Sequence, residues 1–204
     1  MKTKQSITIK LAGFYITSMI AALLISMSAC NNTAKKTNED QVKTENKVKA
    51  PSIDIHAATF MGNVNATTQH IAAGSDINAK DQYGSTPLMV AATFGKTDIA
   101  IALIDGGAKL NIPSNDGSTA LHTAAFFGRT EIVKALLKKG ADKSIKNNYG
   151  STALESVQAP FESVKAIYDQ IGKDLGPFGL KFDYKELEKT RPVIAKLLEN
   201  KEEL

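Results

Sequence analysis

Residues 117–141 read GSTALHTAAFFGRTEIVKALLKKGA, and residues 84–108, which lie 33 positions earlier, read GSTPLMVAATFGKTDIAIALIDGGA. Three series of glycines keep the same step of 33 residues, namely Gly62, Gly95 and Gly128, then Gly84, Gly117 and Gly150, then Gly74, Gly107 and Gly140. Self-similarity at a fixed period of about 20 to 50 residues is typical of repeat architectures. In such an array each unit buries its apolar face against the next, and the long side surface stays free to bind a partner.

Each repeat begins with the pattern expected of a short helix. Thr86 stands where a side-chain oxygen would accept a hydrogen bond from a free backbone amide at the helix start. Pro87 occupies the first helical position, where its missing N–H costs nothing. Leu88 and Ala92 share one face of this helix, and the small alanine allows the next helix to approach closely. Gly95 then ends the helix as a C-cap.

A second helix is predicted in the latter half of each repeat. In the third repeat its apolar face consists of Ile132, Val133, Leu136 and Leu137, which follow helical spacing. Gly140 ends this helix, and the turn that follows is predicted to project as a hairpin. The equivalent turns lie at 83–84, 116–117 and 149–150.

The order of these motifs resembles the ankyrin repeat. The pattern of that family has a threonine-proline-leucine start, an alanine pair, a leucine pair and a closing glycine-alanine-aspartate, and the chain follows it closely over about residues 55–157. The resemblance implies an all-α solenoid of four helix-turn-helix repeats joined by short hairpin loops. The repeats are expected at about 51–80, 81–113, 114–146 and 147–204. The resemblance also implies a function in protein–protein binding and not in catalysis.

The first repeat keeps the register but carries polar substitutions. Thr67 and His70 stand where the third repeat has Val133 and Leu136. A terminal repeat has one face turned to water, so polar residues there suit a cap. We therefore expect His70 to be solvated.

The fourth repeat is interrupted. Ala159-Pro160 breaks it after its first helix, and the segment RPVIAKLL at 191–198 resembles EIVKALL at 131–137. We infer that the second helix of this repeat is delayed and not missing, because an insertion at about 158–185 precedes it. The insertion is expected to contain an amphipathic helix over about 161–171.

The N-terminal leader predicts export and anchoring. Three lysines precede an apolar stretch over 11–29, as in a secretory signal peptide. The stretch ends in Met-Ser-Ala before Cys30, the only cysteine, and this resembles the lipobox of bacterial lipoproteins. The resemblance implies that residues 1–29 are removed as a signal peptide and that Cys30 carries lipid. An uncleaved transmembrane anchor and an ordinary cleavage site with an incidental cysteine are the alternatives.

A polar tether is predicted between the leader and the repeats. Residues 30–50 are rich in Lys, Thr, Asn and Glu and have almost nothing to bury, so they are expected to be disordered. Together with a lipid anchor, they predict a location at the bacterial cell envelope, facing the periplasm or the cell exterior. A single cysteine excludes an intramolecular disulfide, so the folded part depends on packing alone.

The net charge argues against binding to nucleic acid. The chain carries a formal charge of +4, but three of its 25 basic residues lie in the leader, and the remaining 22 (25 − 3) nearly balance the 21 acidic residues. A nearly neutral body lacks the basic surface that phosphate binding requires.

No motif of a known catalytic or cofactor site occurs in the sequence. It lacks G-x-S-x-G, H-E-x-x-H and a phosphate-binding glycine loop, so we predict no catalytic residue, cofactor, metal or small-molecule substrate. His56 and His122 occupy the same place in their repeats and are expected to form hydrogen bonds between neighbouring turns. One remote alternative is an enzyme whose site is formed by the insertion, with Tyr168, Asp169, Asp183 and Tyr184 as candidates. Another is an immunity or accessory protein for a periplasmic toxin or enzyme.

One row of residues is more apolar than the packing of the repeats requires. In the ankyrin family the two positions after the alanine pair face the concave groove, and here they are Phe60-Met61, Thr93-Phe94 and Phe126-Phe127, which we call the groove row. Five of these six side chains are large and apolar, which favours a role in binding an unknown protein partner. The hairpin turns add Gln82, Tyr83, Asn115, Asp116, Asn148 and Tyr149 to the predicted partner-binding residues. The alternative is that the phenylalanines stiffen the stack or pack under the C-terminal insertion.

Overall fold

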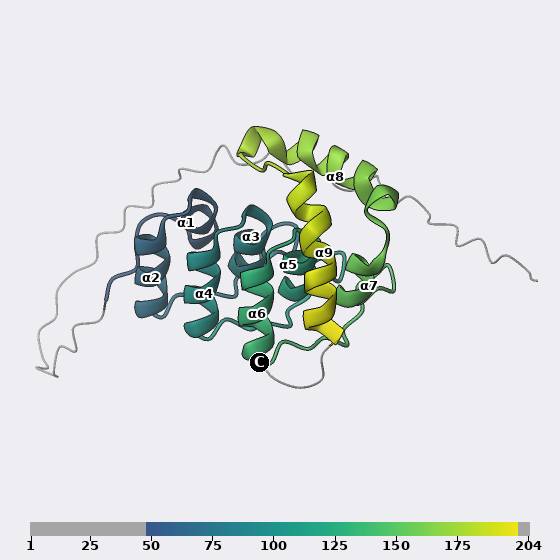
Figure 1. Cartoon of the computed structure of the whole chain (residues 1–204). Coiled ribbons are helices and arrows are strands. Elements are labelled where there is room, and N and C mark those ends of the chain that lie inside the picture. The colour runs from purple at the N-terminus through teal and green to yellow at the C-terminus, as the bar shows by residue number, and fades with distance from the viewer. Residues whose placement is uncertain (1–47, 200–204) are drawn as a thin grey trace, which may run out of the picture.

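The computed structural model describes residues 48–199, and over that range it contains helices joined by turns and loops and no strand (Figure 1). The helices are α1 (Ile55–Met61), α2 (Val64–Ala72), α3 (Pro87–Phe94), α4 (Thr97–Asp105), α5 (Ala120–Phe126), α6 (Thr130–Lys138), α7 (Ala153–Gln158), α8 (Phe161–Leu175), the short 3-10 helix η1 (Gly176–Phe178) and α9 (Tyr184–Glu199). The predicted signal peptide, Cys30 and all but the last three residues of the predicted tether lie outside the described residues.

The helices stack as two parallel rows, as predicted for a solenoid. The inner row contains α1, α3, α5 and α7, and the outer row contains α2, α4, α6 and α9. Each inner helix packs against the next inner helix and against its own outer helix. Figure 1 shows this stack, with α8 running along its upper edge, above the helices from α3 to α7.

Capping fixes where the inner helices begin and end. Thr86 Oγ1 accepts a hydrogen bond from Met89 N at 3.4 Å, and Thr152 and Glu155 form a reciprocal capping box. Gly95 ends α3 with a φ of 64°, in the left-handed region that favours glycine. The predicted cap positions are therefore confirmed.

The core lies between the two rows. The alanine pairs of the inner helices, Ala91-Ala92 and Ala124-Ala125, are fully buried, and their small side chains let neighbouring helices approach closely. Larger side chains such as Leu103 and Leu136 on the outer helices fill the remaining space. Each fully buried leucine contributes about 1.5–3 kcal/mol relative to exposure.

The fourth repeat is completed by α9. This helix contacts both α6 and α7, and its Ile194 and Leu198 join the core of the stack. It therefore occupies the place of a second helix, although α8 and η1 separate it from α7 along the chain. It begins at Tyr184, about two turns before the segment at 191–198 that resembles the third repeat.

The expectation that His70 is solvated is wrong. Its side chain is only 7% exposed, and its two ring nitrogens lie 3.0 Å from Ser75 Oγ and 2.8 Å from Ile53 O. Thr67 is likewise buried, with its hydroxyl donating to Asn63 O. The chain before α1 folds back against α2 and provides the carbonyl partner, so this part of the terminal repeat does not face water.

The hydrogen bonds predicted for His56 and His122 are confirmed. His56 Nε2 lies 3.2 Å from Ser85 O, and His122 Nε2 lies 3.1 Å from Ser151 O, each in the following repeat. The backbone N–H of Thr119 donates to His122 Nδ1 at 3.2 Å. The His122 ring is therefore neutral, with its proton on Nε2.

Acid is expected to destabilise the protein through His122. Burial lowers the pKa of His122 below its usual value, so the unfolded chain binds the proton more readily than the folded chain does. The stability that neutral His122 contributes is present above the unfolded pKa of about 6.5 and is lost as the pH falls below it. We expect urea unfolding, followed by circular dichroism, to give a lower free energy of unfolding at about pH 5 than at about pH 7.5. His122→Gln should reduce this difference, and an unchanged difference in the variant would contradict the assignment.

The hairpin turns form a hydrogen-bonded ladder along one edge of the stack. Asn115 N donates to Tyr83 O at 3.0 Å, and Asn148 N donates to Asp116 O at 2.9 Å. The side chain of Asn115 also donates to Gln82 O at 3.2 Å. Successive turns are therefore held at a fixed spacing.

Gly84→Ala is expected to destabilise the protein more than Gly150→Ala. Both glycines have a positive φ, of 73° and 78°, so both variants carry the same left-handed strain of about 1 kcal/mol. A Cβ at Gly84 would lie 2.8 Å from Asn115 N, whereas a Cβ at Gly150 would meet nothing within 4 Å. We expect Gly84→Ala to cost a further ~1–3 kcal/mol in urea unfolding. Equal losses of unfolding free energy in the two variants would show that the close approach of Asn115 to Gly84 adds no cost.

Candidate partner-binding surface

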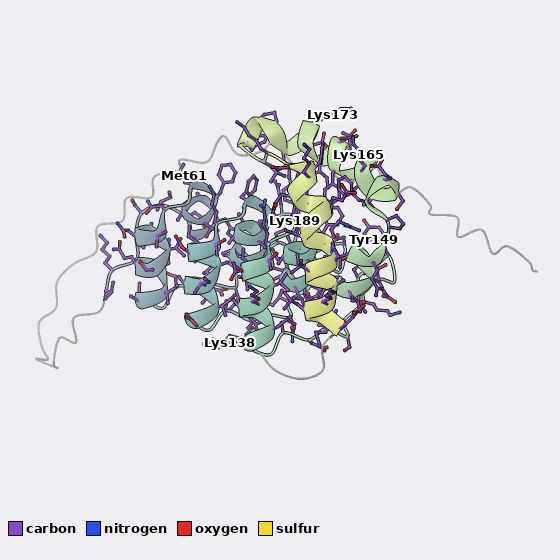
Figure 2. The ribbon with its side chains drawn as sticks, in the orientation of Figure 1. Met61, Lys138, Tyr149, Lys165, Lys173 and Lys189 are labelled. Carbon is purple, nitrogen blue, oxygen red and sulfur yellow. The ribbon has the colours of Figure 1, made fainter. Side chains whose placement is uncertain are left out.

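The groove row lies at the C-terminal ends of the first three inner helices. Its residues directly precede the turns that lead into the outer helices, so successive repeats place them side by side. At one end of the row, the rings of Phe60 and Phe94 pack edge to face with centroids 4.8 Å apart. Met61 is 68% exposed, and Figure 2 shows it at the edge of the first repeat, away from α8.

The insertion covers the other end of the row. Ile171, Leu175 and Leu180 form an apolar cluster with Phe94, Phe126, Phe127 and Phe182. Tyr168 of α8 stacks on Phe126 at 4.6 Å, and Phe182 stacks on Phe127 at 6.0 Å. Only part of the groove row is therefore accessible to a binding partner. Its members Phe126 and Phe127 take part in the intramolecular packing that the sequence left as the alternative.

The open end of the row consists of Phe60, Met61 and the half-buried Thr93. Val64, at the start of α2, adds an exposed apolar side chain that the sequence analysis did not single out. Its signal was an apolar residue at the first position of an outer helix, where the second and third repeats have threonine. Phe94 lies at the boundary, because it contacts both Phe60 and the cluster beneath α8.

The predicted hairpin residues are mostly accessible. Gln82, Asn115, Asp116, Asn148 and Tyr149 are exposed, and Tyr83 is half-buried. Tyr149 is 58% exposed at the last turn, where Figure 2 shows it on the side of α7. Partial burial and the charge of Asp116 raise the pKa of Tyr149, so its phenol is a neutral hydrogen-bonding group at physiological pH.

A buried arginine attaches the insertion to the stack. Arg191 of α9 is 2% exposed and donates to Tyr168 Oη at 3.0 Å. It also donates to Ala159 O at 2.8 Å and Ser156 O at 3.3 Å, at the end of α7. Tyr168 in turn donates to Phe126 O at 2.7 Å, so one network connects α9, α8, α7 and α5.

The sequence analysis gave Arg191 no role. Its signal was its position, because Leu187, Arg191, Ile194 and Leu198 follow one face of α9 at helical spacing. A charged residue within an apolar stripe is expected to be buried. Because burial of a charge is costly, it must have hydrogen-bond partners. Among residues 48–199 no carboxylate forms an ion pair with it, and its acceptors are neutral oxygens.

Of the four residues considered for an enzyme site, the structure joins Asp169 and Tyr184 by a hydrogen bond, while Tyr168 and Asp183 have other partners. Tyr168 is buried in the network described above, and Asp183 accepts a hydrogen bond from Glu186 N at the start of α9. Tyr184 donates to Asp169 Oδ1 at 2.7 Å, beside an open hollow of about 710 Å³ between α8 and the start of α9. This hydrogen bond raises the pKa of Tyr184 and lowers that of Asp169. The pair is therefore a neutral donor with an ionised acceptor, which suits a structural contact.

Two further features bear on the class of site. Within residues 48–199, no group of three or more His, Cys, Asp or Glu side chains is placed to hold a metal ion. No helix of this part of the chain is long and apolar enough to span a membrane.

Comparison with known proteins identifies the repeats. Residues 55–155 match the family model of ankyrin repeats in three copies. No curated protein matches the chain. The matched region covers α1 to the start of α7, whose stacked helix pairs and hairpin turns agree with that family. Ankyrin repeats are in general non-catalytic modules for protein–protein interaction. The protein therefore carries an ankyrin-repeat domain, a helical solenoid of the kind that binds other proteins.

Proposed function

We propose that the protein is a lipid-anchored adaptor of a bacterial cell envelope that binds a protein partner through the open end of the groove row and the hairpin edge. The observation that carries this proposal is the exposed apolar surface of Met61 and Val64 beside the half-buried Phe60. Met61 alone would contribute about 1.5–3 kcal/mol if a partner buried it. Aromatic residues and Met are enriched at protein–protein interfaces relative to the rest of the surface.

The rigidity of the scaffold supports recognition by a preformed surface. The ladder from Gln82 to Asn148 fixes the spacing of the hairpin turns, and capping fixes the ends of the inner helices. A surface held in this way loses little conformational entropy when a partner binds. The exposed amides of Asn115 and Asn148 and the neutral phenol of Tyr149 would supply polar contacts around the apolar centre.

Anchoring through Cys30 would raise the local concentration of this surface at a membrane. A flexible tether of about 20 residues has a root-mean-square reach of roughly 25 Å. Partners on the same membrane would then meet the surface at a high effective concentration. This part of the proposal rests on the resemblance of the leader to a lipoprotein signal.

Met61→Glu is expected to remove partner binding without unfolding the domain. A buried charge in the interface would be strongly unfavourable, whereas the side chain is exposed in the free protein. Ile101→Glu is the matched control, because Ile101 is 39% exposed on α4 and lies outside the groove row. Tagged full-length chains would be purified from the producing cells after crosslinking, and bound proteins quantified by mass spectrometry. A protein retained by the wild type and by Ile101→Glu but lost by Met61→Glu is the expected result. An identical set for all three chains would refute the surface.

Cys30→Ser is expected to move the protein from the membrane fraction to the soluble fraction. Lipidation requires the thiol, and two or more acyl chains give stable membrane anchoring. The measurement is fractionation of cells, combined with labelling by a fatty-acid analogue. Retention of the variant in the membrane without label would favour an uncleaved transmembrane anchor instead.

A further inference from the structure

We infer that the partner presents an amphipathic helix, which lies on the open end of the groove row as an end-to-end continuation of α8. This inference rests on the proposed function and adds the class of partner. The occupant is a helix of a different protein with one apolar, aromatic-containing face and an acidic residue on its flank.

The first observation is that the groove row already holds a helix. The buried residues of α8, namely Tyr168, Ile171 and Leu175, form its inward face. This face packs over Phe94, Phe126 and Phe127. On the outward side, α8 exposes polar and charged residues such as Glu162, Gln170 and Lys173. The side chains of the groove row therefore form a surface on which the apolar face of an amphipathic helix packs.

The second observation is the repeat symmetry of the row. The 33-residue step relates Phe126 to Thr93 and Phe60, and it relates Phe127 to Phe94 and Met61. The backbone that presents Phe60 and Met61 is therefore equivalent to the backbone that carries α8 in the third repeat. At the third repeat these positions are covered, whereas Met61 is 68% exposed.

The third observation is where α8 stops. Gly176 and Pro177 follow the helix, and Gly179, with a φ of 91°, returns the chain toward α9. In Figure 1 the C-terminal end of α8 lies above α3 and does not reach α1. Phe94 contacts both the cluster beneath α8 and Phe60. A second helix placed on Phe60 and Met61 would therefore meet the end of α8 at Phe94.

The length of the open end fits a short helix. Neighbouring packed helices lie about 8–10 Å apart, and a helix rises about 1.5 Å per residue. Covering the first repeat and the space to the second thus requires about ten residues. This is about three turns, enough to place two or three apolar side chains on one face.

The fourth observation is a lysine close to Gly62, the residue that follows Met61. Lys96 is the 33-residue equivalent of Arg129, which donates to Ala92 O at 3.3 Å and Thr93 O at 3.1 Å. Lys96 Nζ lies 3.5 Å from the position that a Cβ on Gly62 would take. It makes no ion pair within residues 48–199. A carboxylate on the flank of the incoming helix would complement it.

The test uses a helical peptide with the sequence of residues 161–175, stapled across its outward positions 163 and 167 and labelled with fluorescein. Fluorescence polarisation would measure its binding to the purified full chain in lipid nanodiscs. We expect binding to the wild type and to Ile101→Glu, and about tenfold or more weaker binding to Met61→Glu. The same peptide with Tyr168→Ala should bind about tenfold more weakly, because it lacks the ring that stacks on the row.

Three outcomes would overturn the inference. The first is equal affinity for Met61→Glu and the wild type, or no binding to either. The second is an affinity that rises about tenfold or more when the chain itself carries Tyr168→Ala, because the peptide would then be displacing the resident α8. The third is a dimer of the chain, seen by sedimentation, that Met61→Glu disperses, which would assign the surface to a second copy.

Failure of this inference is distinguishable from failure of the proposed function. If Met61→Glu abolishes capture of a cellular partner but the peptide does not bind, the proposed surface stands and the inference of a helical partner fails. If neither experiment depends on Met61, both proposals fail.

Discussion

The guanidinium of Arg191 holds the C-terminal part of the protein together. It is buried, no carboxylate in the described part of the chain pairs with it, and its hydrogen bonds reach Tyr168 in α8 and two carbonyls at the end of α7. Those carbonyls lie at the negative end of a helix, where a cation is favourable. Because Tyr168 also donates to Phe126 O, the same network sets how α8 lies over the inner helices. Together with the apolar cluster beneath α8, this side chain of the last helix sets which part of the groove row is covered.

This arrangement reconciles the insertion with the repeat architecture. A repeat needs both of its helices to bury its apolar faces, and α7 alone would leave the end of the stack open. Placing α9 beside α6 and α7 closes that end. The intervening residues form α8, which is free to cover another surface because it is not needed as a repeat helix. The result is a groove that is closed at the third repeat and open at the first.

The two ends of the row differ in polarity as well as in exposure. Under α8 the phenylalanines contact other rings and aliphatic side chains, so they contribute to folding. At the first repeat Met61 remains exposed, and Lys96, which lies close to Gly62, forms no ion pair with any residue of 48–199. An apolar surface flanked by charge is typical of an interface that forms after folding, since the free protein must stay soluble.

The sequence by itself determined the repeat, its helix pairs and its caps, because a 33-residue period and the Thr, Pro and Gly signals act through local backbone geometry. It also located the delayed last helix, since the Ile and Leu pattern at 191–198 repeats that of the third repeat. Tertiary structure alone decided that α8 lies over Phe126 and Phe127, that Arg191 is buried, and that His70 is covered by the chain before α1. These are contacts between segments far apart in the chain. A local sequence pattern does not predict which distant segments pack against each other. For the same reason the sequence identified the groove row but did not determine which end of it is open.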